Sequence, residues 1–288
     1  MTLSIALVTA ADIPAHKKPD EQHLVAALRA HGFDCHEAVW NDSSVKWTAF
    51  DIVLLRSTWD YHLVPDAFCA WLDQCVQHSV RLFNPPEVVR WNMHKSYLIE
   101  LAGQDVAVVP SQLLPRGEQT QLADLVTGKK EIIIKPAISA TAWHTRRIGA
   151  AFTEQDQVWL NQRITELDML VQPYLPEIAE HGEFSFMFFN GRFSHAVLKQ
   201  AREGEFRVQS DFGGTEITYR PSPQEITEAA DMLRTLSNPP LYARVDAARV
   251  DGKLVLMELE LIEPQLFLGL HDQAASLFMA AIKEKLRQ

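Results

Sequence analysis

The stretch LYARVDAARVDGKLVLMELELIEP, residues 241–264, has the pattern of a β-hairpin and decides the type of fold expected for the C-terminal part of the chain. Two runs of alternating apolar residues flank Asp251-Gly252, a dipeptide typical of tight hairpin turns. Alternation puts Glu258 and Glu260 on one face of the second strand. Folding about the turn brings Asp246 opposite them, so that three carboxylates lie within cross-strand reach.

Three like charges this close need a counter-charge. A divalent cation with oxygen ligands, Mg²⁺ or alternatively Mn²⁺, would remove the repulsion and still leave room for phosphate and water. The other interpretation is an exposed sheet face on which the acids simply contact solvent. The hairpin alone leaves both interpretations open.

Two lysines in apolar surroundings favour the first interpretation. Lys135 ends the strand EIIIKP at 131–136, where the proline turns the chain away from the sheet, and Lys95 is expected on a helix over 91–104. Either lysine alone is more often solvated. Together with the three acids they supply what a nucleoside triphosphate and its metal ions require, which is cations on phosphate oxygens and carboxylates on the bridging ions. The small-residue segment ISATA at 138–142, with Ser139, would add backbone N–H groups over the phosphates.

The pattern of apolar residues divides the chain into three expected domains: 1–85, 86–175 and 176–288. In the first domain we expect strands at 3–10, 33–40 and 50–57 and helices at 20–32 and 65–78. In the second we expect strands at 106–110, 131–136, near Ile148 and at 168–175, with helices at 91–104, 119–126 and 154–165. In the third we expect hairpins at 183–200 and 241–264 and helices at 223–236 and 272–286. The first hairpin turns at Asn190-Gly191.

Composition excludes several classes of protein. With 37 acidic and 27 basic residues the net charge is -10, which disfavours a nucleic-acid partner. No apolar run approaches the roughly 20 residues that span a bilayer, so we expect a cytoplasmic protein without a membrane partner. The three cysteines lack CxxC spacing and are expected to be reduced.

Several familiar motifs are absent or incomplete. The sequence DFG at 211–213 lacks the accompanying motifs of a protein kinase. There is neither a GxxxxGK[ST] loop nor a GxGxxG motif, and the eleven histidines show no HExxH spacing. Kinase, P-loop, Rossmann and zinc-enzyme interpretations are therefore disfavoured.

The order of the remaining motifs resembles the ATP-grasp superfamily of carboxylate–amine ligases. The matching elements after residue 84 are Lys95, IIIKP, the small-residue segment, VQPYL, HGEFSF, KQAREGEFRVQSDFGG, and RVD followed by ELE. The resemblance implies an α/β fold with an N-terminal open α/β substrate-binding domain, a central lid domain and a C-terminal antiparallel-sheet catalytic domain. ATP would be held between the last two domains.

The same resemblance implies roles for individual residues. Gln172 and Leu175 would flank the adenine, Glu183 would receive the ribose hydroxyls, and Lys199 would lie near the phosphates with Lys95, Lys135 and Ser139. Asp246, Glu258 and Glu260 would hold magnesium, with two ions expected. The family most often has Asn at the position of Glu260, so this chain carries one extra negative charge there.

The segments LLRSTWDY, NPPEVVRWNMHKSYL and LELIEPQLFL resemble a narrower branch, that of O-ureido-serine cyclo-ligases and related glutathione-synthetase-like ligases. Arg207 and Arg244 would meet a substrate carboxylate or acyl phosphate, although pairing with the nearby acids is an equal alternative for Arg244. Further substrate contacts are expected from Arg56, Trp59, Asp60 and Tyr61 at the end of a strand, from Gly213 and Gly214, and from Glu263 facing an amine. A buried aromatic cluster is the alternative for the four residues at the strand end.

The predicted function is therefore an ADP-forming ligase. It would activate a small amino-acid-like carboxylate as an acyl phosphate, and a nitrogen of the same molecule would close a ring. The alternatives are a ligase that joins two substrates and an ATP-binding module without turnover. A homodimer is one option for the assembly.

Overall fold

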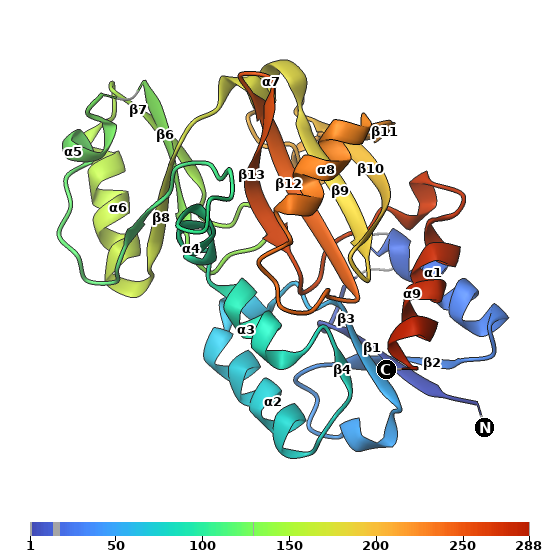
Figure 1. Ribbon diagram of the computed structural model, residues 1–288. Coiled ribbons are helices and arrows are strands. Elements are labelled where there is room, and N and C mark those ends of the chain that lie inside the picture. The colour runs from blue at the N-terminus through green and yellow to red at the C-terminus, as the bar shows by residue number, and fades with distance from the viewer. Residues whose placement is uncertain (1, 14–17, 129, 288) are drawn as a thin grey trace.

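The computed structural model describes residues 2–13, 18–128 and 130–287, which form three sheets, one within each predicted domain (Figure 1). The domain boundaries themselves stay a prediction. The first sheet is parallel, with the strand order β2-β1-β3-β4. Its strands are β1 (Ser4–Thr9), β2 (Asp34–Val39), β3 (Ile52–Ser57) and β4 (Leu82–Phe83).

Helices cover both faces of this sheet because its central strands carry apolar side chains on both faces. Ile5 and Leu7 pack with α1 (Pro19–Ala30) and with α9 (Ala274–Lys285), which comes from the other end of the chain. Ala6 and Val8 pack toward α2 (Pro65–Gln77). The N-terminal sheet therefore shares one of its cores with the C-terminal part of the molecule.

The middle sheet has the order β5-β8-β6-β7 and is antiparallel. It consists of β5 (Gln112–Leu114), β6 (Glu131–Pro136), β7 (Arg146–Gly149) and β8 (Met169–Pro173), and it is accompanied by α5 (Leu122–Val126) and α6 (Glu154–Glu166). Ile132 and Ile134 of β6 are buried with the residues of these helices. Alternation turns Ile133 and Lys135 to the opposite face of the sheet, which is the face that lines a cavity.

The third sheet has the order β11-β10-β9-β12-β13 and is also antiparallel. Its strands are β9 (Glu183–Phe189), β10 (Arg192–Gln200), β11 (Thr215–Tyr219), β12 (Tyr242–Val250) and β13 (Lys253–Glu260). The helices α7 (Pro176–His181) and α8 (Pro223–Asp231) accompany them. Both predicted hairpins are present, and Asn190, Gly191, Asp251 and Gly252 all have the positive φ that tight hairpin turns need.

Three details differ from the sequence-based expectations. The helix predicted over 91–104 is two helices, α3 (Pro86–Met93) and α4 (Tyr97–Ala102), so Lys95 lies in the break between them and not on a helix. The strand predicted at 106–110 makes only an isolated bridge from Val108 to Leu256, and pairing in the middle sheet begins later, at β5. The short elements β4, β11 and α7 were not predicted. In the described part of the chain, no helix combines the length and the apolar character needed to cross a membrane.

Candidate functional site

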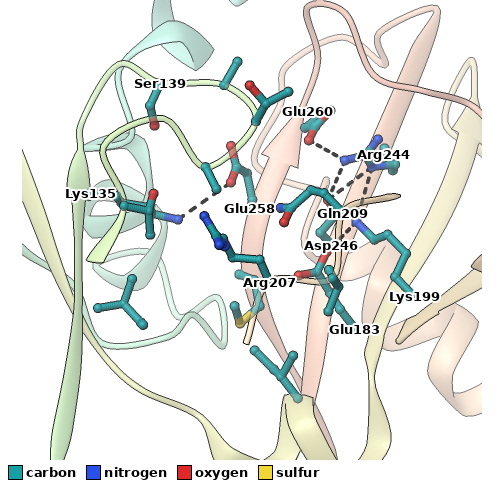
Figure 2. Close-up of a pocket in the computed structure, with 18 of the residues that line it drawn as sticks. Lys135, Ser139, Glu183, Lys199, Arg207, Gln209, Arg244, Asp246, Glu258 and Glu260 are labelled. Atoms are coloured by element: carbon teal, nitrogen blue, oxygen red, sulfur yellow. Dashed lines mark hydrogen bonds and ion pairs between the residues drawn. The ribbon is translucent and has the colours of Figure 1, made fainter. Parts of the chain in front are cut away.

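A cavity of about 720 Å³ lies between the middle and C-terminal sheets. Strands β6 and β8 form one wall and strands β12 and β13 the other, and Trp59 and Tyr61 of the N-terminal domain reach one end. Figure 2 shows that charged side chains from these separate elements point toward one another across this space. Most of the residues predicted from the sequence for a nucleotide and substrate site are therefore brought together.

A β-bulge determines how β13 faces the cavity. Asp246 pairs with Glu258, but the next residue, Ala247, pairs with Leu256, so Met257 is the extra residue. Without the bulge, Met257 and Glu258 would point to opposite faces; with it, both line the cavity together with Glu260. The bulge thus places an apolar side chain next to the predicted metal-binding acids. Sequence alternation alone does not reveal it.

Side chains from α3 and α4 hold the outer edge of β13. Asn92 donates to Leu259 O at 2.9 Å and accepts from Leu261 N at 2.9 Å. The Tyr97 hydroxyl donates to Leu259 O at 3.0 Å and accepts from Leu259 N at 2.8 Å. These contacts satisfy the strand's free backbone groups and fix the carboxylates it carries. Sequence reasoning missed both residues, because they are more than 160 positions from their partners.

The most enclosed charged group in the cavity wall is Asp246, which is 3% exposed. Its two oxygens accept from the Arg244 guanidinium at 2.8–3.1 Å, from Lys199 Nζ at 3.2 Å and from the Ser185 hydroxyl at 2.5 Å. Lys199 also lies 2.5 Å from Glu183, and Arg244 is ion-paired with Glu260 (Figure 2). We call these five charged residues, Glu183, Lys199, Arg244, Asp246 and Glu260, the Asp246 cluster.

Burial and pairing act against each other within this cluster. Burial opposes the charged form of Asp246, but Arg244 and Lys199 hold its pKa below the ordinary value. Burial alone would lower the pKa of Lys199, yet Asp246 and Glu183 raise it. For Glu260, burial together with the neighbouring acids raises the pKa to about 7, although Arg244 opposes the change. Pairing therefore favours the charged form of Asp246, whereas burial favours the neutral form of Glu260.

A glycine permits the approach between Glu183 and Lys199. Gly182 has φ +82, and a Cβ there would come within 2.6 Å of Lys199 O. Glu183 pairs directly with Lys199 across β9 and β10, so the close approach sets both side chains on the cavity wall.

A second charged group bridges the two sheets. Glu258 accepts from Lys95 Nζ at 3.2 Å through one oxygen and lies 3.7 Å from Lys135 Nζ through the other. Burial would raise the pKa of Glu258, but the two lysines hold it below the ordinary value. Burial lowers the pKa of Lys135 despite the attraction of Glu258. We call Lys95, Lys135 and Glu258 the bridging triad.

The helix break explains the position of Lys95 in this triad. Lys95 N donates to Ala137 O at 2.8 Å, and Lys95 Nζ donates to Ser139 O at 2.7 Å, so the lysine joins the break to the small-residue segment. Ser139 itself is 7% exposed and lines the cavity. Thr141 and Ala142, in the same segment, have positive φ and also line the cavity.

The donor chemistry of the three predicted metal ligands fits a hard divalent cation, since all are carboxylates on the cavity wall. As placed here each of them is paired with lysine or arginine. Among the described residues, no group of three or more His, Cys, Asp or Glu side chains is arranged to hold a metal ion by itself. Magnesium usually binds through one or two carboxylates together with substrate phosphates, and this acid set allows that mode.

The end of the cavity opposite Trp59 and Tyr61 is apolar. It is lined by Val109, Ile133, Pro173, Tyr174, Leu175, Ile178 and Met257. Gln172 is buried here and donates to the Ser111 hydroxyl at 2.9 Å. The two residues predicted to flank adenine, Gln172 and Leu175, therefore line the same apolar slot of the cavity.

Arg207 lies in the loop between β10 and β11 and not in a regular strand. Its guanidinium stacks 3.5 Å from the centre of the Phe212 ring and makes two hydrogen bonds to Glu205, at 2.7 and 3.0 Å. Figure 2 shows it pointing into the cavity, which it lines. Gly213 and Gly214 shape this loop but lie outside the lining that the described residues form. A Cβ on Gly214 would come within 2.0 Å of Val208 O.

The end of the cavity beyond the bridging triad is acidic and aromatic. Trp59, Tyr61, Glu260, Glu263 and Phe267 line it. Burial and the neighbouring Glu260 raise the pKa of Glu263 well above its ordinary value. Two other predicted substrate residues lie behind this wall, outside the lining that the described residues form: Arg56, 1% exposed, and Asp60, which accepts from Trp40 Nε1 at 2.7 Å.

Comparisons with known proteins concern the chain as a whole. Residues 5–84 match the family model of the N-terminal domain of D-cycloserine synthetase DcsG. The chain is 29% identical over 300 residues to the cycloserine biosynthesis protein DcsG of Streptomyces lavendulae, with 98% of this chain and 99% of that protein covered. The crystal structure of D-cycloserine synthetase DcsG superposes with a TM-score of 0.89 at 28% identity, covering 98% and 99% of the two chains.

A D-alanine–D-alanine ligase from Bacillus anthracis superposes with a TM-score of 0.71 at 12% identity, covering 99% of this chain and 98% of that one, and at that identity it supports the fold alone. Together the comparisons confirm the fold class, the resemblance and the class of enzyme, an ATP-dependent C–N ligase, that the sequence predicts.

Proposed function

We propose that this chain, which is similar along its whole length to D-cycloserine synthetase, is an ATP-grasp ligase that closes a ring within one small amino-acid-like substrate. A carboxylate oxygen of the substrate attacks the γ-phosphorus of ATP, and ADP leaves. A nitrogen of the same molecule then attacks the acyl carbon, the bond from carbon to the phosphate oxygen breaks, and the nitrogen loses a proton.

One observation carries this proposal: Glu258 lies between Lys95 and Lys135 in the same cavity as Arg244. The two lysines would bind phosphate oxygens at the junction of the two ends. Arg244 would receive the substrate carboxylate, for which its planar guanidinium is suited. The reacting groups would then meet between the bridging triad and the Asp246 cluster, with catalysis supplied by positioning and by neutralisation of charge.

The remaining residues would divide between the two ligands. The base would occupy the apolar slot beside Gln172 and Leu175, and Glu183 would face the ribose. Lys199 and Arg207 would add positive charge near the transferred phosphoryl group. Glu263 would accept a hydrogen bond from the substrate amine, and Trp59 and Tyr61 would exclude water from the acyl phosphate.

Asp246, Glu258 and Glu260 would hold magnesium, with two ions proposed and manganese as a substitute. When bound, the metal would neutralise charge on the phosphate oxygens. Glu260 is the residue that makes this acid set one charge more negative than the usual family pattern. Its ion pair with Arg244 offsets that charge.

A substrate-panel assay tests the proposal. The protein is incubated with ATP, Mg²⁺ and single β-aminooxy, ureido or amino acids, and both ADP and cyclic products are measured. Ring closure predicts ADP release with one added substrate and an equal amount of cyclic product. ADP release that requires two added substrates would identify an intermolecular ligase instead. Stoichiometric ATP binding without substrate-dependent ADP would leave only an ATP-binding module.

A further inference from the structure

The segment of residues 263–268 follows β13 and forms one wall at the acidic end of the cavity. Glu263, Gln265 and Phe267 line the cavity, whereas Pro264, Leu266 and Leu268 are buried on the other side. It belongs to neither a long helix nor a strand, so its shape depends on what binds its backbone.

Asp20, on the first turn of α1, binds three successive N–H groups of this segment. One carboxyl oxygen accepts from Leu266 N and from Phe267 N, the latter at 3.1 Å, and the other accepts from Leu268 N at 2.7 Å. Asp20 is only 3% exposed. Burial raises the pKa of its carboxyl, and Arg56 and the backbone N–H groups oppose that rise.

Four successive carbonyls of the segment are also bound by side chains. Trp59 Nε1 donates to Glu263 O at 3.2 Å and Arg56 Nη2 to Pro264 O at 3.0 Å. Arg244 Nη1 donates to Gln265 O at 3.0 Å. The His195 ring lies 2.9 Å from Leu266 O. Seven backbone groups are thus held by side chains that come from both the N-terminal and the C-terminal domains.

The segment contains a backbone conformation that needs such support. Phe267 has φ +51, in the left-handed region that bulky residues rarely adopt. Asp20 binds the N–H groups of Phe267 and of both its neighbours, and so holds the chain in this conformation. The Phe267 ring then lies beneath the Arg244 guanidinium, 5.7 Å from its central carbon.

We propose that Asp20 is a positioning residue for the substrate: by fixing the 263–268 segment it sets where Phe267, Gln265 O and Glu263 place the substrate against Arg244. This inference rests on the proposed function, because it concerns the same reaction. On this inference the N-terminal domain helps to position the substrate, whereas the apolar slot for the nucleotide is formed without residues of that domain. Asp20 is not among the described residues that line the cavity; of the three residues whose N–H groups it binds, Phe267 lines the cavity.

The test is Asp20→Asn in the full-length protein, with Glu21→Gln as the matched control. Glu21 is the next residue of α1, is also buried, and accepts from the Ser57 hydroxyl at 2.6 Å instead of binding the segment. An amide cannot accept all three N–H groups without turning a donor toward one of them. We expect kcat/KM for the substrate to fall by about 10²-fold, as for misplaced substrate groups generally, with a raised KM.

The affinity for Mg-ATP separates a positioning role from a merely structural one. A general loss of structure would weaken ATP binding as well, whereas misplacement of the 263–268 segment would not. Asp20→Asn should change the Kd for ATP by no more than about twofold to threefold, a difference below one kcal/mol, and Glu21→Gln should leave both parameters near wild type. An equal loss of ATP affinity and of kcat/KM for the substrate would overturn this inference, and so would an unchanged kcat/KM in an active enzyme. Either result would leave the proposed function standing. A wild-type protein that releases no ADP with any substrate of the panel overturns the proposed function and this inference with it.

His195→Leu is the second variant if Asp20→Asn does not fold. It removes the ring that contacts Leu266 O, one hydrogen bond worth about 0.5–1.5 kcal/mol. The expected result is a loss of kcat/KM of about threefold to tenfold with ATP affinity unchanged. A His195→Leu enzyme with wild-type kcat/KM would show that the segment does not position the substrate.

Discussion

The two ends of the cavity are built differently. At the apolar end, Ile133 lies on β6, the run from Gln172 to Leu175 begins on the adjacent strand β8, and these residues present a neutral surface. At the other end, the Asp246 cluster and the bridging triad combine charged side chains from several elements, each paired with another. Removing one apolar residue weakens a contact, whereas removing one charge leaves its partner buried and unpaired. The two ends should therefore respond to substitution with very different magnitudes.

Glu258→Gln is expected to have the largest effect. The amide keeps the size of the side chain but removes the charge between Lys95 and Lys135, along with a proposed metal ligand. We expect kcat to fall by about 10³-fold, in the range found when one preorganised electrostatic group is removed. Steady-state ADP release at saturating ATP and substrate measures it. Glu100→Gln, at an exposed carboxyl outside the cavity, is the control, and comparable kcat values for the two variants would remove Glu258 from the site.

Lys135→Ala tests the proposed phosphate contact. A hydrogen bond to a charged group contributes about 1.5–3 kcal/mol, so the Kd for ATP should rise by about 10- to 10²-fold. Isothermal titration with ATP and Mg²⁺ gives the value. Lys253→Ala, at an exposed lysine next to the hairpin turn, should leave the Kd unchanged. An unaltered Kd for Lys135→Ala would place the phosphates elsewhere.

Glu260 predicts a pH dependence of stability in the free protein. Its pKa is about 7 in the folded state against 4.5 for the ordinary carboxyl, so between these values the folded state binds more protons than the unfolded one. The contribution of Glu260 to stability is therefore present at low pH and is lost as the pH rises from 4.5 to about 7. We expect Glu260→Gln to remove this loss, about 1–3 kcal/mol at pH 8. Urea denaturation at pH 5 and pH 8, without metal, compares the variant with the wild type.

The opposite pH trend for Glu260 would contradict that assignment. Glu258, whose pKa is lowered by the two lysines, contributes with the reverse sign: its stabilisation is lost as the pH falls below the ordinary value. A wild-type protein that gains stability from pH 5 to pH 8, with Glu260→Gln showing the same gain, would mean that Glu260 titrates normally.

The sequence predicted those parts of the molecule that depend on local pattern. The hairpin turns, the position of Lys135 at the end of β6 and the facing acids of β12 and β13 follow from alternation and turn residues. The bulge at Met257 did not follow, because it is set by pairing with β12. The break at Lys95 did not follow either, since an amphipathic pattern continues through it while Ala137, 42 positions away, binds its N–H.

Partners distant in sequence also explain what was missed at the acidic end of the cavity. Arg56 has the right position at the end of β3 for a ligand contact, but its guanidinium binds the backbone of Pro264, 208 positions later. Asp20 carries no motif at all, and its three hydrogen bonds to the 263–268 segment connect it with the cavity. A side chain that binds backbone groups requires no particular residue type in its partner segment, so the sequence shows no motif for the contact.

Met257→Ala, at the apolar end of the cavity, should have the smallest effect of these substitutions. The side chain lines the slot next to Glu258, yet it is neutral and lies only partly out of solvent, so its truncation should lower ATP affinity by about 1 kcal/mol, or fivefold. Because the contact would be the same in the ground and transition states, KM for ATP should rise with kcat unchanged at saturation. Val255→Ala, two residues earlier and outside the described lining, is the control. A fall in kcat as large as that of Glu258→Gln would show instead that the bulge, and not the charge that it exposes, organises the reacting groups.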